Sequence, residues 1–106
     1  MSKANLYTDT GEPKRIRCYM MKRNPTIDYI TVVYTHANRL GYPAGTVLYR
    51  AMNDAPRSPQ GYGQWGEAER NQFCPGGSIV PFSELPSECQ VVVNQDYKDL
   101  WGGNAV

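Results

Sequence analysis

The chain has 106 residues, of which 41% are hydrophobic and 20% charged, and its formal net charge is +1. This length is typical of one domain, so we expect a single domain over residues 1–106. Twelve aromatic residues favour a folded core over disorder. The beginning of the chain lacks an apolar leader, and no run of about 18 apolar residues occurs, so we expect no signal peptide, no membrane span and a cytoplasmic location.

Positive and negative residues are unevenly divided along the chain. Residues 1–57 contain nine Lys and Arg against four Asp and Glu, whereas residues 58–106 contain two against six. Two interpretations are open: a basic sheet and an acidic helix attract each other within one fold, or a basic face meets an acidic partner. Because the whole chain is nearly neutral, sequence-specific DNA binding is not favoured.

The cysteines and the single histidine provide no legible metal or catalytic motif. Cys18, Cys74 and Cys89 are odd in number and lack the C-x-x-C spacing, which argues against a complete disulfide framework and a four-ligand zinc site. We expect free, mostly buried thiols in a reducing compartment. His36 is the one candidate base, and a histidine after a strand is usually a polar loop residue. We therefore expect no metal, no cofactor and no catalytic residue.

Three segments have the pattern of β-strands. Residues 1–13 are polar, end in a turn-like stretch and are expected to be loosely ordered. Residues 14–22 alternate in polarity, which predicts a half-buried strand. Residues 26–35 are rich in β-branched and aromatic residues on both faces, which predicts a central strand covered on both sides. Residues 45–52 predict a third strand.

The second half of the chain predicts an irregular segment followed by a helix. Residues 53–78 contain eight Gly and Pro in 26 positions, which indicates a long loop with one helical turn at 66–73. Residues 86–101 predict an amphipathic helix, in which Ser87 and Gln90 have the spacing of a capping box. Its apolar stripe consists of Cys89, Val92, Val93, Tyr97, Leu100 and Trp101.

These elements predict an α+β fold. A small antiparallel meander of three strands, with room for more, is packed by the C-terminal helix, and a long Gly- and Pro-rich loop joins the two parts. The helix can cover only one face of the sheet. The second face must be covered by the loop that carries Trp65 or by a partner.

The first candidate binding surface is the basic strand. Arg15 and Arg17 project from one face of the predicted strand, and Lys22 and Arg23 follow at its end. Such a stripe can meet phosphates or acidic side chains. The alternative is that these residues protect an edge strand from aggregation.

The second candidate surface is the aromatic loop within residues 56–67. Arg57, Tyr62, Gln64 and Trp65 lie there among glycines and prolines. Glycine lets a backbone approach a ligand closely, and exposed Tyr and Trp are common at interface hot spots and on nucleic-acid stacking platforms. The alternative is that Trp65 folds back as a lid over the sheet.

One resemblance suggests a different class of function. The stretch GTVLYRAM, with Arg50 late in a strand, resembles the strand of ADP-ribosyltransferases whose arginine grips the dinucleotide. Glu67-Ala68-Glu69 is similar to the paired acidic motif of that family. The resemblance implies a small enzyme or nucleotide-binding protein that uses Arg50 with Glu67 or Glu69. If this resemblance is set aside, the two glutamates indicate the first turn of a short solvated helix.

The leading hypothesis is a small non-enzymatic interaction module that binds a protein or nucleic-acid partner, with a protein favoured, through the basic strand and the aromatic loop. No convergent set of catalytic groups is legible in the sequence. Small, motif-free chains of this kind resemble accessory proteins of bacteriophages and other mobile elements, including inhibitors of host defence. The third hypothesis is a structural homo-oligomer in which Trp65 and an exposed strand edge pack against a second copy.

Overall fold

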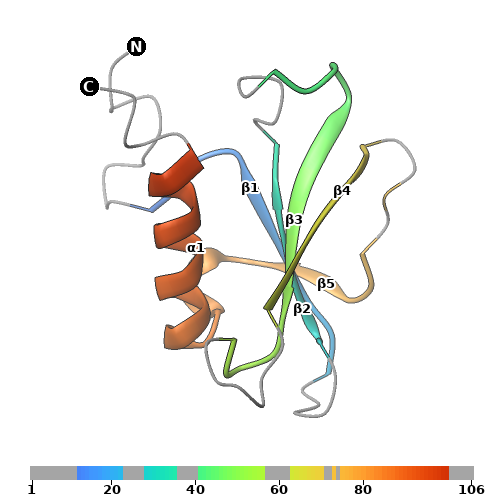
Figure 1. The fold of residues 1–106 in the computed structure, drawn as a ribbon. Helices are drawn as coiled ribbons and strands as arrows, with labels where there is room; N and C mark the ends of the chain where they lie inside the picture. Colours follow the sequence, from blue (N-terminus) through green and yellow to red (C-terminus); the bar gives the residue numbers. More distant parts are fainter. Residues whose placement is uncertain are drawn as a thin grey trace.

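The computed structural model describes residues 12–22, 28–35, 41–56, 63–70, 73 and 75–100. It confirms the α+β class and the C-terminal helix (Figure 1). The elements are β1 (Ile16–Met20), β2 (Ile30–Tyr34), β3 (Thr46–Met52), β4 (Gly63–Glu69), β5 (Ser78–Val80), the short 3-10 helix η3 (Phe82–Glu84) and α1 (Ser87–Leu100). The strands form one sheet in the order β4-β3-β2-β1-β5, and every neighbouring pair is antiparallel.

The three predicted strands form the middle of this sheet. β1, β2 and β3 pair in sequence order, so the expected meander is present and gains one strand on each side. Cys18 pairs with Val32, and Val32 pairs with Arg50 on β3. Because side chains at paired positions share a face, this row points toward α1.

The prediction of an irregular segment over residues 53–78 was wrong in part. Residues 63–69 form β4, so the first half of the segment 66–73, for which one helical turn was predicted, belongs to a strand, and Ser78 begins β5. β4 pairs along its whole length with β3, and this pairing stabilises a segment whose glycines give it low strand propensity. An added Cβ at Gly66 would overlap the ring of Tyr49, so glycine makes room for that ring.

The connection between β4 and β5 crosses the sheet. The two strands lie at opposite edges, and α1 lies on one side of the sheet (Figure 1). Phe73, within this connection, stacks on Tyr49 with ring centroids 4.6 Å apart, on the face opposite α1. The Gly- and Pro-rich segment therefore covers part of the second face, which is one of the two alternatives stated above, but it does so with Phe73 and not with Trp65.

The main core lies between α1 and the sheet. The predicted stripe is confirmed at Cys89, Val92, Val93 and Tyr97, which are buried, while Trp101 lies outside the described residues. Their partners from the sheet and the preceding turn include Cys18, Ile30, Val32, Tyr34, Leu48, Met52 and Leu85. Of the helices described, none is long and apolar enough to cross a membrane.

The beginning of α1 differs from the predicted capping box. The Gln90 side chain donates to the carbonyl oxygens of Leu85 (2.9 Å) and Ser83 (3.2 Å) and so binds the chain that precedes the helix. The Gln90 backbone N–H donates to the Pro86 carbonyl at 3.0 Å, which closes the first helical turn. Residues 1–13 were predicted to be loosely ordered. Of these, residues 1–11 lie outside the described residues, whereas Pro13 is buried.

Candidate functional site

A groove lies on the face of the sheet opposite α1, which we call the open face. The side chains of Arg17 and Tyr19 alternate with the buried Cys18, so they point to this face. The groove has a volume of about 420 Å³, and we call it the arginine groove. The residues that line it include Arg15, Arg17, Tyr19, Val33, Arg70 and Phe73.

Arg15 reaches the groove from an unusual backbone conformation. Its φ of 59° lies in the left-handed region, and it is the one non-glycine residue with positive φ in the described part of the chain. The N–H and Oγ1 of Thr35 both donate to the Arg15 carbonyl, at 3.1 and 2.6 Å. A strained residue persists only where its surroundings hold it, and such residues concentrate at ligand sites.

Thr35 also holds the second arginine of the groove. Arg70 Nη2 donates to the Thr35 carbonyl at 3.1 Å, and the Arg70 backbone N–H donates to the Gly45 carbonyl at 2.7 Å. Arg17, the third arginine, lies in β1 two residues after Arg15 and pairs with Val33 on β2. None of the described residues that line the groove is an Asp or Glu. The three guanidinium groups therefore make a local positive field that attracts anions.

The remaining walls of the groove are apolar. Phe73 is fixed there because its ring stacks on Tyr49 at an interplanar angle of 21° and because its N–H donates to the Glu69 carbonyl at 2.9 Å. Pro75 follows on the same wall, and Val33 belongs to the floor. The groove thus combines a rigid apolar surface with three arginine side chains at its border. A ligand could therefore make apolar contacts and charge interactions in the same groove.

The predicted binding residues are divided by the structure. Arg15 and Arg17 line the arginine groove, and Lys22 is exposed beyond the end of β1 without lining it. Trp65 lies on the other face, because it pairs with Arg50 in the row that points toward α1. The basic strand and Trp65 therefore do not form one surface. Of the other predicted residues, the backbone of Gln64 belongs to β4, and Arg23, Arg57 and Tyr62 lie outside the described residues.

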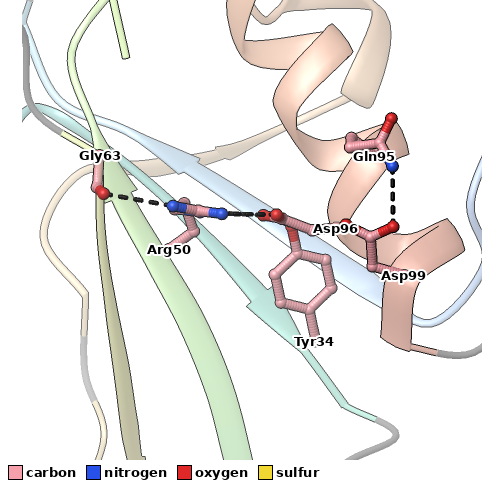
Figure 2. Close-up of polar contacts among 6 residues, drawn as sticks. All are labelled: Tyr34, Arg50, Gly63, Gln95, Asp96 and Asp99. Atoms are coloured by element: carbon pink, nitrogen blue, oxygen red, sulfur yellow. Dashed lines mark hydrogen bonds and ion pairs between the residues drawn. The ribbon is translucent and has the colours of Figure 1, made fainter. Parts of the chain in front are cut away.

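Trp65 packs against Arg50 and Tyr34, which belong to a polar cluster between the sheet and α1. Figure 2 shows the hydrogen bonds of this cluster. Arg50 Nε donates to Asp96 Oδ2 at 2.9 Å, Nη2 donates to Oδ1, and Nη1 donates to the Gly63 carbonyl at 3.2 Å. The Tyr34 hydroxyl donates to Asp96 Oδ2 at 3.0 Å. The guanidinium carbon of Arg50 lies 4.4 Å from the centroid of Trp65, in a cation–π contact.

This cluster bears on the resemblance to ADP-ribosyltransferases. The Arg50 guanidinium is engaged by Asp96, Gly63 and Trp65, so Nε, Nη1 and Nη2 each donate a hydrogen bond within the fold. Glu67 lines a separate depression of about 360 Å³ beside Trp65. Arg50 instead lines a cavity of about 320 Å³ together with Asp96 and other residues of α1. The cavity that Arg50 lines and the depression that Glu67 lines have no lining residue in common.

Two of the three cysteines are buried and free. Burial, and to a smaller extent the charge of Glu12, raises the pKa of Cys18 to about 12. Burial, followed by the charges of Asp54 and Glu88, raises the pKa of Cys89 to about 12. Both thiols are therefore protonated and unreactive near neutral pH. The described residues contain no cluster of three or more His, Cys, Asp or Glu that would hold a metal ion.

Arg70 is the groove arginine that the sequence prediction missed. The segment GEAER was interpreted as a helical turn, which gave Arg70 no relation to Arg15 or Arg17. The one available signal was the alternation of Gly66 and Ala68 with Glu67 and Glu69, which is the period of a strand. No protein family model matches the chain, and neither the curated proteins nor the solved structures contain a significant match.

Proposed function

We propose that the protein is a non-enzymatic interaction module whose arginine groove binds an acidic segment of a partner protein. The observation that carries this proposal is the convergence of Arg15, Arg17 and Arg70 on one groove of about 420 Å³. Thr35 is hydrogen-bonded to two of these arginines. Part of the site is therefore ordered before a partner binds, which lowers the entropic cost of binding.

A protein segment suits the groove better than a nucleic acid. Phe73 and Pro75 border the groove with an apolar wall, which a peptide can use for side-chain contacts. Nucleic-acid binding depends on a more extended positive surface. Here the net charge is +1, and β4 carries the exposed Glu67 and Glu69 on its other face.

A binding role also fits the chemistry of the groove lining. Among the described lining residues the polar groups are arginine, tyrosine and threonine, without a carboxylate, imidazole or thiol to act as a general base. An accessory or inhibitory role, as in bacteriophages and other mobile elements, would use the groove to occupy an acidic surface of a host protein. We place this activity in the cytoplasm, because the buried free thiols of Cys18 and Cys89 suit a reducing compartment.

The proposal is tested with a fluorescent peptide of alternating Glu and Ser and the variant R17A/R70A. We expect the double substitution to weaken binding of the peptide by about tenfold at low salt, because two charge-assisted contacts are lost. The matched control is K22A/K98A, which removes the same charge at two exposed residues outside the groove and should bind as the original protein does. Fluorescence anisotropy measures both.

Two results would overturn the proposal. Equal loss of affinity in R17A/R70A and K22A/K98A would mean that net charge, and not the groove, attracts the peptide. A single-stranded oligonucleotide of equal charge that binds through Arg17 and Arg70, while the peptide does not bind, would replace the protein partner with a nucleic acid.

A further inference from the structure

The two edges of the sheet differ in how open they are to another strand. β5 forms one edge with three residues, and Pro75 and Pro81 lie close to its two ends. Short edge strands and prolines prevent the addition of further strands. β4 forms the other edge with seven residues, Gly63–Glu69, and contains no proline. Of the two sheet edges formed by the described residues, only the outer edge of β4 is long enough to pair with an extended segment.

One backbone hydrogen bond shows which residues of β4 direct their peptide groups toward β3 and which direct them outward. The Arg70 N–H donates to the Gly45 carbonyl, which makes residues 45 and 70 a hydrogen-bonded pair. In an antiparallel ladder such pairs alternate with non-bonded ones, so the next bonded pair in this register joins Val47 and Ala68, and the one after it Tyr49 and Gly66. The intervening residues of β4 therefore direct their peptide groups away from β3.

These outward residues are Gly63, Trp65, Glu67 and Glu69. The Gly63 carbonyl already accepts from Arg50, and the Glu69 carbonyl accepts from Phe73. In the part of the chain that the structure describes, the outward N–H and C=O groups of Trp65 and Glu67 have no backbone partner. The middle of the outer edge thus presents two donors and two acceptors in the spacing of a strand.

The side chains along this edge have a definite chemical character. Trp65 is 44% exposed, and both Glu67 and Glu69 are exposed on the same face. Beside them lies the depression of about 360 Å³, whose lining residues include Tyr42, Leu48, Trp65 and Leu100. The edge therefore combines an aromatic anchor and an apolar depression with two negative charges two residues apart.

From these features we infer that the outer edge of β4 binds an extended basic segment of a partner protein as an additional antiparallel strand. Main-chain hydrogen bonds to Trp65 and Glu67 supply the pairing. Alternate side chains of the segment face Trp65, Glu67 and Glu69, so Lys or Arg belongs opposite the two glutamates and an apolar residue opposite Trp65. This surface lies on the opposite face from the arginine groove and does not depend on it.

A second copy of the chain is a poorer occupant of this edge. Pairing β4 with β4 of another copy would bring Glu67 and Glu69 of both copies together on one face of a two-strand ladder. Like charges at neighbouring positions of a ladder are destabilising. A basic segment neutralises the same glutamates, so charge complementarity selects the partner of opposite sign.

Amide hydrogen exchange tests the inference on the isotope-labelled full chain. The probe is a short peptide with Thr at every second position, in which two Lys and one Val share the other face so that they lie opposite Glu69, Glu67 and Trp65, and the control peptide carries Glu in place of Lys. With the basic peptide in excess, we expect exchange at the Trp65 and Glu67 N–H groups to slow by at least about tenfold. The N–H groups of Gly66 and Ala68, which bond to β3, are protected beforehand and should change little. Slowing by the acidic peptide as well would overturn the charge selection.

Substitutions separate this site from the arginine groove. E67Q/E69Q should weaken the basic peptide by about tenfold, whereas E84Q/E88Q, which neutralises two exposed glutamates elsewhere, should not. R17A/R70A should bind the basic peptide as the original protein does, so failure of one proposal does not affect the other. Unchanged exchange with the basic peptide would overturn the inference. Slowing that appears without peptide as protein concentration rises would also overturn it in favour of a second copy.

Discussion

Arg50 on β3 and Asp96 on α1 form a two-bond ion pair that joins the sheet to the helix (Figure 2). The side chains are 17% and 8% exposed, so the pair is largely shielded from water. Tyr34 donates to the same carboxylate from the neighbouring strand. One acidic group of the helix is thus held by two strands, which fixes how α1 is positioned along the sheet.

Replacing Asp96 by Ala should lower the free energy of unfolding by about 3 kcal/mol. The substitution leaves the Arg50 charge mostly buried and removes the acceptor of the Tyr34 hydroxyl, and breaking one partner of a buried pair is costly. Urea unfolding measures the change. The double variant R50L/D96L should lose less stability than D96A, because no buried charge remains. A loss below about 1 kcal/mol in D96A would show that the pair is well hydrated.

Replacing Gly66 by Ala should destabilise the open face by about 1–3 kcal/mol, because the new methyl group overlaps the Tyr49 ring. Tyr49 cannot easily move away, since Phe73 stacks on its other side. In a Y49A background the same substitution should cost much less, and a double-mutant cycle of unfolding free energies detects the difference. Equal costs in both backgrounds would mean that the ring does not occupy the space above Gly66.

Arg15 can be replaced in two ways that separate backbone strain from binding. Asn tolerates the left-handed conformation, whereas a β-branched Val at φ 59° should cost about 1–2 kcal/mol more in the free energy of unfolding. Both variants lack the guanidinium and should weaken binding of the acidic peptide equally. Thermal unfolding and anisotropy report the two effects. Equal stability of the two variants would indicate that residue 15 leaves the left-handed region in solution.

The stability of the protein should fall as the pH rises above about 9. The folded chain keeps the thiols of Cys18 and Cys89 protonated up to a pKa of about 12, whereas the ordinary pKa of a cysteine thiol is 9.0. Between these values only the unfolded chain releases the protons, so ionisation favours unfolding by up to ~1.4 kcal/mol per pH unit for each thiol. Burial also raises the pKa of Tyr34, which acts in the same direction at higher pH.

The double variant C18A/C89A isolates the thiol contribution to this pH dependence. Its stability is lower at every pH because two buried side chains are shortened, but its loss of stability between about pH 9 and pH 12 should be smaller. Urea unfolding at several pH values gives both slopes. Identical slopes would show that the two thiols ionise alike in the folded and unfolded chain.

The middle strands and the helix could be predicted because their patterns are local. The alternation in β1 and the steps of three and four in α1 depend on residues close in sequence. β4 could not be predicted in this way. Its residues Gly63 and Gly66 disfavour a strand, and the strand forms because β3 pairs with it and Tyr49 requires the space above Gly66.

In the candidate site, too, the residues that follow a local pattern could be predicted, and those that long-range pairing brings together could not. Arg15 and Arg17 were named from strand alternation, but Arg70 joins them only through the pairing of β3 with β4. The role of Arg50 was missed, although the sequence held a signal for it. Asp96 occupies a position of the apolar helix stripe between Val93 and Leu100, and a carboxylate on a buried face requires a buried partner.

The prolines close to the two ends of β5 have a consequence for how this protein behaves at high concentration. Growth of a fibre by strand addition requires that each added copy offer a fresh edge to the next one. Here a copy that docks through β4 would present only the three residues of β5, close to Pro75 and Pro81, on its far side. Strand addition therefore ends after one step, and the chain can leave one edge available for recognition without polymerising.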